Sequence, residues 1–184
     1  SMTDEPVRSA TYAMIDYAKK KNKIISFDPN LRPPLWESEE LAAKQIWYGI
    51  EQCDILKIAD NEIEWLTGTD DYDKGIEIIR QRTHAKLINV TLGPNGSIAY
   101  YGDHKVFMEP YLNENTIETT GAGDTFGACA LHAVLKNGLD NMTEEDLKEM
   151  LQFANAAASL VTTKKGALRV MPEEKEIKEL IDKN

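Results

Sequence analysis

Hydrophobic residues in the first half of the chain fall into short apolar runs that alternate with longer amphipathic stretches. Apolar runs typical of strands buried in a parallel sheet occur at residues 24–27, 55–58 and 87–91. Stretches with apolar residues at helical spacing occur at residues 7–21, 39–52, 61–66 and 72–82. This half is therefore predicted to alternate between helices and strands.

The second half adds an antiparallel piece and two further helices. Residues 97–101 and 105–108 flank a turn signal at 102–104 and are predicted to pair as a hairpin. A helix rich in small residues is expected from Asp124 to about Lys136, and Thr143 is expected to cap a longer helix. This pattern predicts one α/β domain over residues 1–184, with a mainly parallel sheet covered by helices on both faces.

Composition and charge exclude several classes of protein. The 184 residues are 42% hydrophobic and 28% charged, as in ordinary globular proteins. The formal net charge of -10 repels polyanions, which argues against nucleic acid and anionic membranes as partners. No apolar run approaches the ~20 residues of a membrane span, and no secretory leader pattern is present, so we expect a cytoplasmic protein. Two cysteines and three scattered histidines predict reduced thiols and no zinc site.

The segment at residues 119–126 carries the most specific chemistry. Gly121 and Gly123 permit a tight turn at the start of a helix, where free N–H groups and the helix dipole attract an anion. Asp124 lies in the first turn of that helix, where its carboxylate could take a proton from an alcohol attacking a phosphoryl group. The alternative is a tight loop followed by an acidic residue that complements the dipole. No Walker-type phosphate loop is present.

Five segments, in this order, resemble the motifs of the ribokinase/PfkB family of carbohydrate kinases, and the resemblance covers nearly the whole chain. The first, Asp-Pro-Asn-Leu-Arg followed by Pro-Pro-Leu-Trp, resembles the fructokinases of that family. The segments lie at residues 28–36, 61–68, 91–96, 119–126 and 155–167. The resemblance implies a ribokinase-like three-layer fold and ATP-dependent phosphorylation of a sugar hydroxyl, with fructose as the expected sugar.

The resemblance also implies a role for individual residues. Asp124 would be the catalytic base, and the N–H groups beside Gly121, on Ala122, Gly123 and Asp124, would form an anion hole. Asn61 and Glu64 would organise Mg²⁺ and its waters near the phosphates of ATP. The remaining nucleotide contacts would come from Arg32, Thr91, Gly93, Gly96 and, near the adenine, Asn155.

Each of these residues also has a plainer interpretation. Asn61 and Glu64 could form an exposed helix face, and Arg32 a surface ion pair. The glycines at 93 and 96 could belong to an ordinary β-turn, and a mid-helix residue such as Asn155 commonly points to solvent.

One position departs from the family pattern. The family usually has aspartate at the position of Glu118, where it helps to hold a monovalent cation together with carbonyls of the loop at residues 165–167. The longer side chain of Glu118 leaves activation by potassium open.

The family is also considerably longer than this chain. Its sugar pocket and its lid lie in an amino-terminal half that this sequence does not contain, so we expect little sugar phosphorylation by the chain alone. An opened sheet edge or apolar patch would favour a homo-oligomer. The alternatives within the family are a kinase for ribose, a nucleoside or a keto-deoxy sugar acid, and a non-catalytic regulatory subunit.

Overall fold

The computed structural model describes residues 2–183, in which helices and strands alternate as the sequence predicts. The helices are α1 (Val7–Lys20), α2 (Glu39–Gln52), α3 (Asp60–Thr67), α4 (Tyr72–Arg80), α5 (Ala122–Asn137), α6 (Glu144–Val161) and α7 (Glu174–Ile181). The strands are β1 (Ser26–Phe27), β2 (Ile55–Ala59), β3 (Leu87–Thr91), β4 (Ser97–Tyr101) and β5 (His104–Met108). Single turns of 3₁₀ helix occur at Pro33–Leu35, Gly93–Asn95 and Leu168–Val170.

The strands form one mixed sheet in the order β1-β2-β3-β4-β5, which confirms the α/β class. β1 pairs with β2 in parallel, and β4 pairs with β5 as the predicted antiparallel hairpin. Two elements differ from the prediction. β1 is only two residues long, although residues 24–27 form a continuous apolar run, and α7 was not predicted. β1 lies at the end of the strand order, so it has a ladder partner on one side only.

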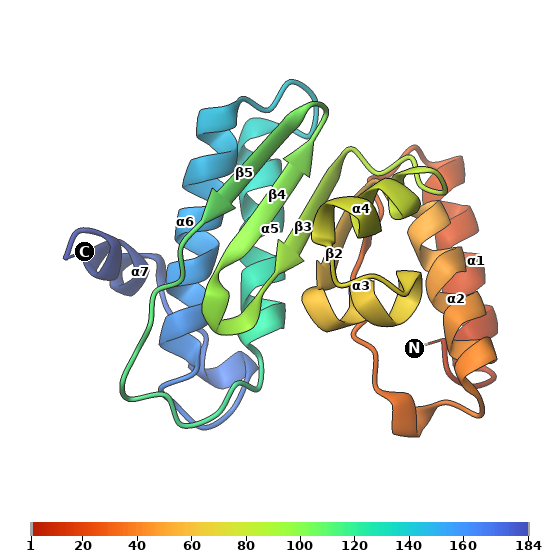
Figure 1. Cartoon of the computed structure of the whole chain (residues 1–184), viewed down its shortest axis with the longest axis horizontal. Coiled ribbons are helices and arrows are strands. Elements are labelled where there is room, and N and C mark those ends of the chain that lie inside the picture. The colour runs from red at the N-terminus through yellow and green to blue at the C-terminus, as the bar shows by residue number, and fades with distance from the viewer. Residues whose placement is uncertain (1, 184) are drawn as a thin grey trace. The chain divides into compact units, whose positions relative to one another are not determined.

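The chain divides into two compact units, residues 1–89 and 90–184. In the first unit α1 and α2 lie side by side (Figure 1), joined by a hydrogen bond from the Tyr12 hydroxyl to Gln45 and by contact between the Tyr12 and Tyr48 rings, 4.6 Å apart. The Phe27 ring of β1 lies against Gly49 of α2, where an added Cβ would be 2.3 Å from the ring. Glycine therefore lets α2 approach the sheet closely.

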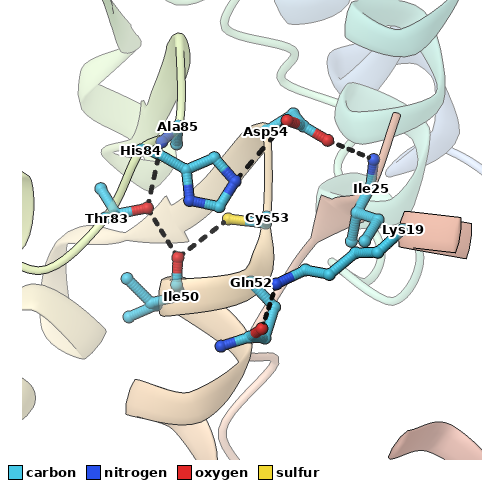
Figure 2. A network of polar contacts seen from close by, with 9 residues as sticks. All are labelled: Lys19, Ile25, Ile50, Gln52, Cys53, Asp54, Thr83, His84 and Ala85. Atoms are coloured by element: carbon cyan, nitrogen blue, oxygen red, sulfur yellow. Dashed lines mark hydrogen bonds and ion pairs between the residues drawn. The ribbon is translucent and has the colours of Figure 1, made fainter. Parts of the chain in front are cut away.

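Polar contacts tie together the segments that lead into β1, β2 and β3 (Figure 2). Asp54, just before β2, accepts the Ile25 N–H at 2.8 Å and lies 3.7 Å from the His84 imidazole. The Thr83 hydroxyl donates to the Ile50 carbonyl at 2.6 Å. These contacts occupy a backbone N–H just before β1 and a carbonyl in the last turn of α2, neither of which would otherwise be paired by the sheet.

In the second unit α5 and α6 lie side by side behind the β4–β5 hairpin (Figure 1). The register pairs Ser97 with Met108 and Tyr101 with His104. Thr143 caps α6 as predicted: its hydroxyl accepts the Asp146 N–H at 3.2 Å, and the Asp146 carboxylate accepts the Thr143 N–H at 2.8 Å. No helix among the described residues is both long enough and apolar enough to cross a membrane.

Both cysteines are free thiols. Burial raises the pKa of Cys53 to about 12 and that of Cys129 to about 11. Both side chains therefore stay protonated near neutral pH.

Candidate functional site

The glycine segment of the second unit forms a turn at the start of α5. Gly121 is the residue before the helix and has a φ of 83°, in the left-handed region that glycine adopts readily. A Cβ at this position would lie 3.1 Å from the Cβ of Ala167. Glycine is thus required both by the backbone conformation and by the loop that passes beside it.

Some backbone amides at this turn donate hydrogen bonds within the turn, and others are available to a ligand. The Ala122 N–H donates to the Thr119 carbonyl at 3.1 Å, and the Thr125 N–H donates to the Gly121 carbonyl at 2.8 Å. The amides of Gly123 and Asp124 lie in the first turn of α5, where no preceding helical carbonyl is available. Of the three amides in the predicted anion hole, that of Ala122 is already bonded within the turn, which leaves the Gly123 and Asp124 amides as its available donors.

The Asp124 side chain is exposed in that same first turn. Its carboxylate is one residue away from the Gly123 amide and is accessible to a ligand from solvent. The turn thus combines an acceptor for a proton with two N–H donors and the positive end of a sixteen-residue helix. This combination suits the transfer of an anionic group to a hydroxyl.

Glu118 contacts the loop at residues 165–167, with which the family resemblance implies a shared cation site. Its Oε1 atom accepts the Gly166 N–H at 2.8 Å, which fastens the 165–167 loop beside the turn at Gly121. One carboxylate oxygen is therefore engaged with the protein. No cluster of three or more His, Cys, Asp or Glu residues able to hold a metal ion occurs within residues 2–183.

The turn after β3 holds three of the predicted nucleotide contacts. Thr91 ends the strand, Gly93 has a φ of 56° and Gly96 has a φ of 95°. A Cβ on Gly96 would lie 2.2 Å from the Met108 carbonyl oxygen, whereas a Cβ on Gly93 would meet nothing within 4 Å. Gly96 is thus required for packing against the end of β5, while Gly93 leaves open space beside the turn.

Asn155 is buried between α6 and the β4–β5 hairpin. The side chain is 8% exposed, and its Oδ1 accepts the Ser97 hydroxyl at 2.8 Å. Its Nδ2 donates to the carbonyls of Met108 and Glu109, at 3.2 and 2.9 Å. Asn155 therefore joins α6 to both strands of the hairpin, and its predicted contact with adenine stays a prediction. The solvent-facing alternative is excluded, because a buried amide must be hydrogen-bonded.

The first unit holds the other predicted residues in two segments. Arg32 is exposed in the turn after β1, and Asn61 and Glu64 are exposed on α3, which begins where β2 ends. Three residues apart on a helix, Asn61 and Glu64 share one face. One carboxylate and one amide oxygen fit the way Mg²⁺ is commonly held, with waters and phosphate oxygens completing an octahedron.

Glu62 connects these two segments and was missed by the sequence analysis. Its side chain is buried, with Oε1 accepting the Leu31 N–H at 2.6 Å and Oε2 accepting the Ala59 N–H at 2.9 Å. The carboxylate thus holds the turn that contains Arg32 against the first turn of α3. The available signal was an acidic residue at the third helical position, the usual place for a reciprocal cap.

A partly buried ion pair lies beside Glu62. Asp28 is 3.2 Å from the Lys57 ammonium, and burial, opposed by Lys57, raises the pKa of Asp28 above its ordinary value. The carboxyl ends of β1 and β2 are therefore joined by two polar links, the Asp28 pair and the Glu62 bridge.

Comparison with known proteins gives the family. The profile of the pfkB family carbohydrate kinases matches residues 1–174. Fructokinase-1 of Zea mays is 38% identical over 183 residues, an alignment that includes 100% of this chain and 56% of the maize protein. Fructokinase-2 of Solanum habrochaites is 37% identical over 94% of this chain and 52% of its own length. The chain spans about half the length of the curated relatives that it matches.

Solved structures of fructokinases have the same fold. Fructokinase from Vibrio cholerae, with fructose, ADP and calcium bound, superposes with a TM-score of 0.87 at 26% identity, over 98% of this chain and 57% of that one. Fructokinase from Xylella fastidiosa with bound ATP gives a TM-score of 0.87 at 26% identity, over 99% of this chain and 59% of that one. From its profile match and its identity to the fructokinases, this chain belongs to the pfkB family of carbohydrate kinases.

Proposed function

We propose that the chain is the nucleotide-binding and catalytic part of an ATP-dependent sugar kinase. The observation that carries the proposal is the start of α5, where the exposed Asp124 carboxylate and the free amides of Gly123 and Asp124 share one turn. The family membership and the ATP bound to the Xylella relative support it.

In the proposed reaction Asp124 takes the proton of the sugar hydroxyl as its oxygen attacks the γ-phosphorus of ATP. The bond to the β,γ-bridging oxygen breaks, and ADP leaves with that oxygen. The two amides and the α5 dipole stabilise negative charge on the transferring group. Bound Mg²⁺ would neutralise phosphate charge, and in the first unit Asn61 and Glu64 would hold it.

Fructose is the proposed sugar. The curated relatives that match nearly all of this chain are fructokinases, and the Asp-Pro-Asn-Leu-Arg segment at residues 28–32 resembles theirs. The chain alone should transfer little phosphate, because positioning of both reactants supplies much of the rate and the relatives use a chain nearly twice as long.

A chimera tests this function. The matching segment of the maize fructokinase would be replaced by this chain, and phosphorylation of fructose, ribose, a nucleoside and a keto-deoxy sugar acid would be measured. We expect fructose to be preferred, and Asp124→Asn to lower kcat by about 10²–10⁴-fold with little change in the KM for ATP. A folded chimera that keeps its kcat after Asp124→Asn would refute the role of Asp124.

Three further features belong to the proposal. A monovalent cation would bind at the Glu118 carboxylate and the neighbouring loop carbonyls, which predicts that potassium raises the activity of the chimera. The protein would act in the cytoplasm without nucleic-acid partners, in keeping with its acidic charge. The chain would also form a homo-oligomer, which sedimentation at several protein concentrations tests directly.

A further inference from the structure

The outer face of α1 carries an apolar stripe exposed to solvent. Val7, Met14 and Tyr17 are 51%, 66% and 64% exposed, and the exposed Ala10 and Ala13 lie on the same side of the helix. Their spacing of three and four residues places them within about 120° of the helix circumference. An exposed stripe of this kind is typical of an interaction surface.

The stripe is distinct from the face that α1 uses within the first unit. Ile15 is buried, Tyr12 bonds to Gln45, and Lys19 bonds to Gln52 of α2, and helical spacing places these three residues on the opposite side of α1 from the stripe. α1 is thus apolar on two sides, and only one of them has a partner among the described residues. A helix with two apolar sides is common where it lies between two packed layers.

We propose that the α1 stripe binds the same stripe of a second copy, with the two helices antiparallel. A two-fold axis near residue 12 would place Val7 opposite Tyr17 of the second copy and Ala10 opposite Met14 of the second copy. Each contact then joins a smaller side chain to a larger one, the arrangement that lets two helices pack at the usual separation of about 8–10 Å. The stripe is therefore complementary to itself only in the antiparallel direction.

The charges beside the stripe favour the same arrangement. Glu5 lies at the amino end of α1, where its carboxylate bonds to Ser9, and the exposed Lys20 lies at the carboxyl end on that same side. The two-fold axis that pairs the apolar residues brings Glu5 to within about one residue of the position opposite Lys20 of the second copy. A parallel pair would instead place like charges together, which is unfavourable. This inference names the surface for the self-association proposed above and does not depend on the kinase reaction.

Sedimentation velocity over a range of protein concentrations tests the proposal, at ~0.15 M salt so that the net charges are screened. One helix pair is a small interface, so we expect a reversible dimer with a dissociation constant on the order of 10 µM. Met14→Lys should raise that constant at least tenfold. Leu135→Lys, which changes an 84% exposed leucine on α5, should leave it unchanged.

Charge reversal tests the direction of the pair. Lys20→Glu should weaken the dimer, and Glu5→Lys combined with Lys20→Glu should restore it, because each reversed residue again meets its opposite. A protein that stays monomeric at all concentrations would refute both the self-association and the assignment of the α1 stripe as its interface. The stripe would then be expected to bind something else, such as the additional chain of the longer relatives. A dimer that is unaffected by Met14→Lys, or that the double reversal does not restore, would refute the α1 stripe as the interface but not the self-association itself.

Discussion

Removing the Glu62 carboxylate should release the turn that carries Arg32 from the start of α3. Glu62 is 6% exposed and accepts two backbone N–H groups, at 2.6 Å from Leu31 and 2.9 Å from Ala59. Glu62→Ala removes both acceptors and leaves two partly buried donors, whereas Glu62→Gln keeps one acceptor oxygen. The two variants therefore separate loss of one bond from loss of both.

The cost follows from these two bonds. A hydrogen bond to a charged acceptor contributes about 1.5–3 kcal/mol, and water can relieve part of the loss where the donor is only half-buried. We expect the free energy of unfolding of the first unit to fall by about 3 kcal/mol in Glu62→Ala and by about 1.5 kcal/mol in Glu62→Gln. Glu64→Ala, on the exposed face of the same helix, should stay within about 0.5 kcal/mol of the parent.

Urea unfolding followed by amide hydrogen exchange measures both the global and the local effect. If Glu62 holds the turn, exchange at the Leu31 amide should become roughly a hundredfold faster in Glu62→Ala, because about 3 kcal/mol corresponds to that factor. The reasoning fails if Glu62→Ala and Glu64→Ala are equally stable, or if the Leu31 amide exchanges at the parent rate in Glu62→Ala.

Other expected outcomes follow from single contacts. Gly96→Ala should cost about 3 kcal/mol and lower Tm by roughly 10 °C, because its Cβ would lie 2.2 Å from a carbonyl of β5 at a φ of 95°. Gly93→Ala is the control and should lower the free energy of unfolding by only about 1 kcal/mol, because its Cβ would meet no neighbour. Equal Tm values for the two variants would contradict the packing argument. At pH 8 alkylation of Cys53 should be about 10³-fold slower in the folded chain than in urea, since burial raises its pKa from 9.0 to about 12; equal rates would contradict this. Asn155→Ala should destabilise the β4–β5 hairpin by about 2–4 kcal/mol in hydrogen exchange, whereas an unchanged hairpin would mean that its bonds contribute little.

Local patterns in the sequence predicted most of the fold. The long helices and β3 were found because periodicity and capping residues such as Thr143 act over a few neighbouring positions. β1 was predicted too long because Ile24 and Ile25 are apolar, whereas the Ile25 N–H is bonded to the Asp54 side chain and the register with β2 begins at Ser26. α7 was missed, although its spacing is strongly amphipathic.

The candidate site was predictable where the backbone itself carries the chemistry. The glycines at 121 and 123 predicted a turn at the start of a helix, and the structure has that turn, with the Asp124 side chain exposed. The hydrogen bonds of Asn155 to the hairpin were not predicted, because its three partners lie 46 to 58 residues away in the sequence. Glu62 was overlooked for the same reason: its bond to Leu31 spans 31 residues.

The central claim is that the start of α5 binds the terminal phosphate of a nucleotide. The most direct test is a titration of the ¹⁵N-labelled chain with Mg²⁺ and a non-hydrolysable ATP analogue, followed by amide resonances. We expect the Gly123 and Asp124 amides to shift saturably, with a smaller change at Ala122 because its N–H is already bonded to Thr119. Saturable binding that leaves the Gly123 and Asp124 amides unshifted, or no binding at millimolar nucleotide, would contradict the account.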